Sequence, residues 1–197
     1  MIHSASSHGS SALQRELAAA LLARPRCTLD ELARSAGISR ATLYRIAGSR
    51  EGLTTALLES GYQALEAAAG LLATEPADGR LERATTALMR SWPLVLMTLD
   101  QLPESPQRVG SRAGGDEKWA GVEQSFEAFF LAGQRLGGYR LDINAAWITD
   151  FYWACFRSVS QSLARRQLAA SFAPTYVLEL FRHGARVRAV VDPSQRP

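Results

Sequence analysis

Residues 28–53 of the chain, TLDELARSAGISRATLYRIAGSREGL, decide the fold because they encode two short helices joined by a tight turn. The stretch from Thr28 to Glu31 has the pattern of a capping box, in which each of the two side chains accepts from the other residue's backbone amide. Gly37 is placed to adopt the left-handed conformation that ends a helix. Ser39 is placed to cap the next helix. The spacing therefore predicts a helix-turn-helix unit.

The exposed face of the second helix carries residue types that bind DNA. We expect Leu43 and Ile46 to face the protein interior, which leaves small, hydroxyl-bearing and arginine side chains outside. Small residues allow close approach to base edges, arginine hydrogen-bonds guanine bidentately, and hydroxyls bind phosphate. The outward residues are Arg40, Ala41, Thr42, Tyr44 and Arg45. We predict that this helix enters the major groove of double-stranded DNA; the alternative is an ordinary solvated helix surface.

Two segments, AGISRATLY at 36–44 and SREGL at 49–53, closely resemble the signature of the TetR-type (tetracycline-repressor-like) bacterial transcriptional regulators. The resemblance implies an all-α fold with an N-terminal three-helix DNA-binding domain that contains the helix-turn-helix. A larger helical domain that binds a small effector and forms a homodimer is expected to follow. Members of the family usually repress transcription until the effector binds.

The resemblance also implies roles for individual residues. Arg40, Ala41 and Tyr44 are expected to approach bases, and Thr42 and Arg45 to lie on the phosphate backbone. Arg50 is expected to contact phosphate from the start of the following helix, and Thr28 to touch the backbone across the groove. The full predicted DNA-binding set is Thr28, Ser39, Arg40, Ala41, Thr42, Tyr44, Arg45 and Arg50.

The chain departs from the family pattern directly after Tyr44. The family usually continues with an aromatic residue or histidine and then a phenylalanine, whereas this chain reads Arg45-Ile46-Ala47. A core-filling ring is therefore missing at position 47, and Ile46 or a neighbouring helix is expected to fill that space. A phosphate-contacting group is also missing at position 46.

Charge and composition agree with a DNA-binding N-terminal segment. The chain has 197 residues and a formal net charge of +3. Residues 1–56 contain seven arginines and four acidic residues, while the fifteen basic and fifteen acidic residues that follow cancel. The positive excess therefore coincides with the predicted helix-turn-helix, as attraction to phosphate requires.

The remaining bulk features indicate a cytoplasmic protein. Cys27 and Cys155 are too few for a disulfide framework, and no apolar run is long enough to span a bilayer. Residues 1–11 are rich in Ser, His and Gly and lack a basic start and a hydrophobic block. We interpret them as a disordered leader and not as a signal peptide, and expect no contact with a membrane.

Apolar residues recur at helical spacing through the chain. We place a DNA-binding domain at 12–56 and a larger domain for effector binding and dimerisation at 57–197. The expected helices beyond the helix-turn-helix span 13–24, 50–73, 81–102 with a kink at Pro93, 116–136, 143–167 and 174–190, and residues 103–115 are expected to form a loop. Asn144 or Asp142 is expected to cap the helix at 143–167.

The segment 143–167 carries two apolar stripes, so this helix is expected to pack against two partners. One stripe contains Trp147, Phe151 and Ala154, and the other runs from Ile148 to Leu163. We predict that one stripe faces the chain's own core and that the other joins the final helix in a symmetric dimer interface. The predicted interface residues are Ile148, Tyr152, Cys155, Val159, Tyr176, Leu180 and Phe181. In the alternative, both stripes lie within one chain.

Large aromatic residues are concentrated in helices that are expected to surround one interior. Such a set is typical of a pocket for an apolar or aromatic effector, although aromatic residues at helical spacing are equally typical of a plain core. The predicted pocket residues are Trp92, Trp119, Phe126, Phe130, Trp147 and Phe151.

Two other function classes are weighed. Cys155, His183 and Asp150 include a nucleophile and a base, but the sequence has no nucleophile elbow, metal-spaced His/Cys cluster or glycine-rich phosphate loop. We therefore expect no enzyme, cofactor or metal. A helix-turn-helix that binds protein would present a more apolar face than residues 40–45 do. The sequence predicts a homodimeric regulator that binds a palindromic operator in double-stranded DNA and responds to a small-molecule effector.

Overall fold

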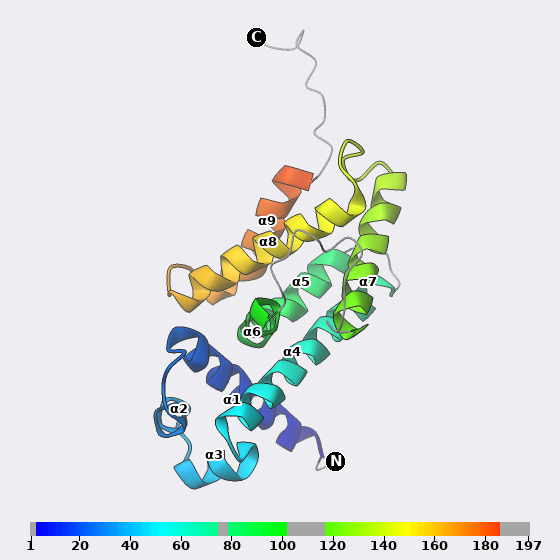
Figure 1. The fold of residues 1–197 in the computed structure, drawn as a ribbon. Helices are drawn as coiled ribbons and strands as arrows, with labels where there is room; N and C mark the ends of the chain where they lie inside the picture. The colour runs from blue at the N-terminus through cyan, green and yellow to red at the C-terminus, as the bar shows by residue number, and fades with distance from the viewer. Residues whose placement is uncertain (1–2, 75–78, 102–116, 186–197) are drawn as a thin grey trace.

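The computed structural model describes residues 3–74, 79–101 and 117–185, and in these ranges the regular elements are all helices, with no strand (Figure 1). The helices are α1 (His3–Ala23), α2 (Leu29–Ser35), α3 (Arg40–Ala47), α4 (Arg50–Leu72), α5 (Arg80–Arg90), α6 (Trp92–Gln101), α7 (Glu117–Arg135), α8 (Ala145–Ala164), the short 3-10 helix η1 (Ala170–Phe172) and α9 (Ala173–Ala185). Among these helices none combines the length and the apolar character that crossing a membrane requires. The all-α prediction is confirmed.

A small hydrophobic core, here called the N-terminal core, joins α1, α2, α3 and the first half of α4. Its buried residues are Leu17, Ala18, Leu21, Cys27, Leu32, Ala33, Leu43, Leu53, Leu57, Leu94 and Met97. The short helices α2 and α3 contribute only two and one of these side chains, and the others come from α1, α4, α6 and Cys27. The two short helices therefore depend on the long ones for their stability, since isolated helices of this length are marginal in water.

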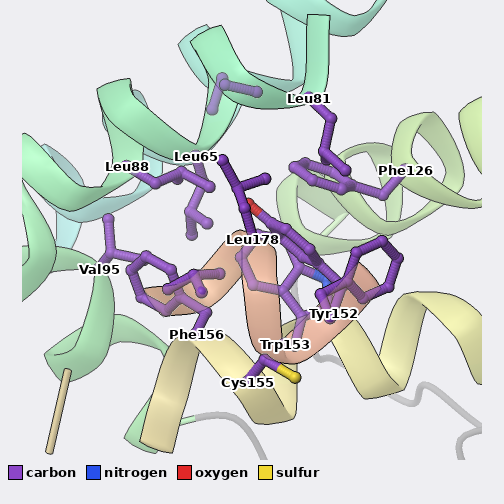
Figure 2. Close-up of a cluster of buried hydrophobic side chains, with 14 of the residues drawn as sticks. Leu65, Leu81, Leu88, Val95, Phe126, Tyr152, Trp153, Cys155, Phe156 and Leu178 are labelled. Atoms are coloured by element: carbon purple, nitrogen blue, oxygen red, sulfur yellow. The ribbon is translucent and has the colours of Figure 1, made fainter. Parts of the chain in front are cut away.

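A larger hydrophobic core, the C-terminal core, lies among α4, α5, α7, α8 and α9. Figure 2 shows its centre, where Leu65, Leu81 and Leu88 meet side chains from α7, α8 and α9. The hydroxyl groups of Tyr152 and Thr85 share a hydrogen bond of 2.9 Å there. Burial raises the pKa of Tyr152 above its ordinary value, so the phenol stays neutral and both polar groups are satisfied.

Helix α6 belongs to both cores. Leu94 and Met97 lie in the N-terminal core, whereas Val95 and Leu99 lie in the C-terminal core. The short apolar helix therefore has almost no exposed face: its residues from Pro93 to Leu99 are all buried. The boundary that we propose between residues 56 and 57 falls inside α4, so the two units also share one continuous helix.

Helices α4 and α6 cross in close contact at Gly61. The Thr98 hydroxyl donates to the Leu94 carbonyl at 3.0 Å and approaches the Leu58 carbonyl of α4 at 3.4 Å. A Cβ atom on Gly61 would collide with Thr98 Oγ1 and would lie 2.7 Å from the Leu94 oxygen. Only glycine allows the two backbones to come this near.

Two predicted boundaries differ from the structure. Helix α1 begins at His3, so the prediction of a disordered leader at 1–11 is wrong from residue 3 onward; no proline interrupts this stretch before Pro25. The single kinked helix predicted at 81–102 is two helices, which separate at Ser91 (φ −116°). Pro93 lies in the first turn of α6, where a missing amide hydrogen costs little.

Other predicted boundaries are confirmed. Asn144 caps α8, with its side chain accepting from the Trp147 amide at 2.8 Å. Asp142, the competing candidate, instead pairs with Arg140. The predicted loop at 103–115 and the end of the last predicted helix, beyond Ala185, lie outside the described residues.

The predicted dimer interface uses the wrong stripe of α8. The stripe of Ile148, Tyr152, Cys155 and Val159 is buried in the chain's own C-terminal core, as is Phe181 of α9. The physical reason is that α7 and α9 both pack on that side of α8. The other stripe is the open one: Trp147 is 50 % exposed and stacks on Phe151, and Ala154 is exposed. Figure 1 shows α8 and α9 side by side.

We predict that Gly61→Ala lowers the free energy of unfolding by about 2 kcal/mol, because the added methyl group forces α4 and α6 apart. The matched control is Gly70→Ala in the same helix, where an added Cβ meets nothing within 4 Å. That substitution is expected to stabilise the protein by up to about 1 kcal/mol. Urea unfolding followed by circular dichroism measures both, and equal effects of the two substitutions would contradict the crossing described here.

Candidate nucleic-acid interface

The start of α2 has the predicted capping box. The Thr28 hydroxyl accepts from the Glu31 amide at 3.3 Å, and the Thr28 amide donates to Glu31 Oε2 at 2.7 Å. The backbone hydrogen bond from Thr28, followed by the one from its side chain, lowers the pKa of the Glu31 carboxyl. The carboxylate is therefore ionised at neutral pH and fixes the direction in which α2 leaves the loop that precedes it.

The turn between α2 and α3 has the hydrogen-bond pattern of a Schellman motif. The Ile38 amide donates to the Ala33 carbonyl at 3.0 Å and the Gly37 amide to the Arg34 carbonyl at 3.3 Å. Gly37 has φ of +65°, the left-handed value that this motif requires. Ile38 then packs against the N-terminal core. The predicted left-handed glycine is confirmed, and the turn angle follows from backbone chemistry alone.

Helix α3 is capped as predicted and is attached to the protein by one side only. The Ser39 hydroxyl accepts from the Thr42 amide at 3.0 Å. Leu43 is fully buried, and Ala47, one turn later, packs against the same core. Ile46 is 55 % exposed, so the prediction that it faces inward is wrong. The reason is geometric: Leu43 and Ala47 already fill the contact, and no described element covers the flank on which Ile46 lies.

The remaining side chains of α3 form an outward surface of mixed chemistry. Tyr44 is 41 % exposed, and Arg40, Ala41 and Arg45 are exposed. The Arg40 guanidinium lies 5.5 Å from the centroid of the Tyr44 ring. Its Nε atom lies 2.9 Å from the Asp30 carboxylate of α2.

Asp30 was not predicted from the sequence, because nothing local marks the partner of an arginine ten residues away. This exposed ion pair links α2 to α3. An arginine held by a carboxylate keeps other N–H donors in its planar fork available for a second acceptor.

Three further residues of the predicted DNA-binding set, Ser39, Thr42 and Arg50, have partners within the protein. The hydroxyl groups of Ser39 and Thr42 lie 2.8 Å apart, so each is held close to the cap of α3. Arg50 donates to the Cys27 carbonyl through one terminal nitrogen and to the Pro25 carbonyl through the other. Its guanidinium is therefore engaged with the loop between α1 and α2.

The aromatic residues predicted to line an effector pocket separate into two groups. Trp119, Phe126 and Phe130 are fully buried in the C-terminal core, and Trp92 packs against it. Trp147 is half exposed on the outer side of α8, so it does not line the interior and its assignment to the pocket is wrong. Phe151 lies between Trp147 and α9, where its ring occupies the space beside Gly184.

The buried rings contact one another face to edge and at tilted angles. The centroid of the Trp153 ring lies 4.7 Å from that of Phe126 and 5.4 Å from that of Trp119. The indole nitrogens of Trp119 and Trp153 are both buried and have no hydrogen-bond partner among the described residues. Such orphan donors are costly in an apolar interior. Trp153 was not predicted, because it lies between the two predicted stripes.

The residues considered for catalysis do not have the properties of a nucleophile and base. Burial raises the pKa of the Cys155 thiol to about 11, so the reactive thiolate is scarce at neutral pH. His183 is 80 % exposed and lies 3.5 Å from Glu179 in the same helix. A surface hollow of about 460 Å³ lies elsewhere, over the loop between α1 and α2, and is lined by Arg24, Pro25, Arg26, Cys27 and Glu31.

The capped pair α2–α3, with its outward polar surface, defines a helix-turn-helix protein. A helix-turn-helix transcriptional regulator of Pseudomonas aeruginosa, NfxB, is 32 % identical over 178 residues, which cover 88 % of this chain and 92 % of that protein. No family model matches the chain. The chain therefore belongs to the helix-turn-helix transcriptional regulators, and its fold is similar to that of TetR-family regulators.

Solved structures support the fold. A TetR-family regulator, PfmR, from Thermus thermophilus is similar with a TM-score of 0.57 and 20 % identity, over 86 % of this chain and 97 % of that one. A γ-butyrolactone receptor (ArpA-like protein) is similar with a TM-score of 0.62 and 17 % identity, over 91 % of this chain and 89 % of that one. At these identities the likeness concerns the architecture alone.

Proposed function

We propose that this regulator is a homodimer that binds a palindromic DNA operator through α3 and represses transcription until a small effector releases it. The observation that carries the proposal is the outward face of α3. The apolar side chains that pack α3 against the N-terminal core are Leu43 and Ala47, and the helix presents Arg40, Ala41 and Tyr44 to solvent. Arginine, a small residue and an aromatic hydroxyl match base edges and phosphates in a major groove.

The proposed base-contacting and phosphate-contacting residues occupy different parts of this surface. Arg40 lies in the first turn of α3, where recognition helices contact base edges, and it forms an ion pair with Asp30. Arg45 lies in the last turn and is exposed. We therefore assign Arg40 to a base pair and Arg45 to the sugar-phosphate backbone.

The proposed dimer uses the open stripe of α8 together with α9. Trp147 and Leu180 are 50 % and 52 % exposed, and Phe151, Tyr176 and Ala154 continue the same apolar surface. Exposed aromatic and aliphatic side chains on two adjacent helices are typical of a protein interface. A two-fold axis along this face would join two copies into a four-helix contact.

The proposed effector is a small, neutral molecule with an apolar body and a hydrogen-bond acceptor. The C-terminal core contains apolar and aromatic residues and no charged side chain among those described, which disfavours a charged ligand. The orphan indole donors of Trp119 and Trp153 favour a ligand that brings an acceptor, such as a carbonyl oxygen.

DNA binding is tested by selecting duplexes from a random pool and measuring affinity at several salt concentrations. Arg40→Ala is expected to reduce discrimination at one base pair by about tenfold, as loss of a bidentate contact does. Arg45→Ala is expected to weaken all sequences equally and to lower the slope of log K against log salt by about 1. Arg135→Ala, at an exposed position in α7, is the control and should bind as the wild type does. Absence of any preferred duplex would refute the proposal.

Dimerisation is tested by Leu180→Asp, which places a charge in the proposed interface. The variant is expected to be a monomer by size-exclusion chromatography with light scattering, because an unpaired buried carboxylate opposes association. Ile46→Asp is the control, since Ile46 is equally exposed but belongs to α3, which lies away from α8 and α9 (Figure 1). A Leu180→Asp variant that remains dimeric would show that the subunits meet elsewhere.

The effector class is tested by screening neutral aromatic ketones and esters for release of the bound duplex. Trp153→Phe keeps an aromatic ring but removes the N–H group, so the concentration needed for release should rise about fivefold, the value of one hydrogen bond. Leu136→Ala, at an exposed position just after α7, should leave it unchanged. Equal potency on wild type and Trp153→Phe would contradict the role of the indole donor.

A further inference from the structure

The guanidinium of Arg50 joins two segments that are distant in the sequence. Arg50 is the first residue of α4, and its two terminal nitrogens donate to the carbonyl oxygens of Cys27 and Pro25. Both acceptors lie in the short connection between α1 and α2, more than twenty residues earlier in the chain. The planar guanidinium therefore spans two carbonyl groups. The rigid guanidinium of arginine suits this arrangement, and the single ammonium of lysine does not.

The connection that Arg50 holds determines where α2 begins. The Cys27 amide donates to the Arg24 carbonyl at 3.1 Å, and the Cys27 side chain is buried in the N-terminal core. Thr28, the next residue, is the N-cap of α2. The carbonyls of Pro25 and Cys27 lie outside any helix, so they have no helical amide to satisfy them. Arg50 supplies the donors.

The other end of this contact is fixed to the recognition helix. Ser49, directly before Arg50, caps α4 by accepting from the Gly52 amide at 3.0 Å. Gly48 ends α3 with φ of +66°, and its amide donates to the Tyr44 carbonyl at 2.8 Å. Only two residues, Gly48 and Ser49, separate α3 from α4. Arg50 thus ties the point where α2 starts to the point where α3 ends.

We infer that Arg50 is a positioning residue, which clamps the α1–α2 connection and thereby sets the placement of α2 and Thr28 relative to α3, and that it is not a phosphate ligand. The inference rests on the proposed DNA binding, and it replaces the phosphate contact that the family resemblance implies for this position. Both terminal nitrogens of Arg50 already donate to carbonyls within the protein and the residue is only partly exposed, whereas Arg45 is exposed to solvent.

The test compares Arg50→Lys and Arg50→Ala with Arg45→Lys and Arg45→Ala, on the selected duplex and well below the unfolding temperature. If Arg50 clamps the α1–α2 connection, lysine cannot replace it. Both variants then lose about tenfold in DNA affinity, because the loss of two hydrogen bonds to a charged group leaves α2 and Thr28 less firmly placed relative to α3. Arg50→Lys keeps the wild-type salt slope, since no phosphate contact is removed. For Arg45, lysine restores binding, and only alanine lowers the slope by about 1.

Two measurements without DNA keep the clamp separate from the proposed function. Both Arg50 variants should lower the midpoint of thermal unfolding by about 5 °C, and hydrogen exchange at the Cys27 amide should accelerate. Wild-type stability and wild-type exchange in both variants would overturn the clamp, as would Arg50→Lys that binds DNA as tightly as the wild type. If the wild-type protein itself prefers no duplex, the proposed function fails while the unfolding and exchange data still decide the clamp.

Discussion

The structure depends on the packing of α6 between two hydrophobic cores. Its ten residues place Leu94 and Met97 against the helix-turn-helix unit, and Val95 and Leu99 against the larger bundle. Each core would lose part of its buried apolar surface without this helix. The close crossing with α4 at Gly61 fixes the helix along its length. Because packed cores have discrete arrangements and do not deform continuously, a displacement of α6 changes the contacts of both units together.

Helix ends were predictable because their chemistry is local. The capping box at Thr28, the left-handed Gly37 and the Ser39 cap each involve residues within five positions of one another, so the sequence shows both partners. The same holds for Asn144 at the start of α8. The start of α1 escaped prediction because polar small residues disfavour a helix only weakly, and the helix from Leu13 onward extends back through them.

The direction in which a helix face points was less predictable. Periodicity correctly separated Trp147 and Phe151 from Ile148 and Tyr152, but it does not say which stripe a neighbouring helix covers. That depends on where α7 and α9 lie, which is a property of the whole fold. The exposure of Ile46 was not predicted for the same reason. The ion pair of Asp30 with Arg40 and the partners of Arg50 arise from contacts distant in sequence, and no local pattern announces them.

The residues that hold α3 in place are different from those that it exposes, and this separation affects how such proteins evolve. Leu43 and Ala47 hold the helix, and Ser39 and Gly48 define its two ends. Positions such as Ala41 and Tyr44 take no part in either task, so exchanges there leave folding almost unchanged. Target preference can therefore drift from one descendant to the next without compensating mutations in the scaffold, and the genes under control can change faster than the architecture that controls them.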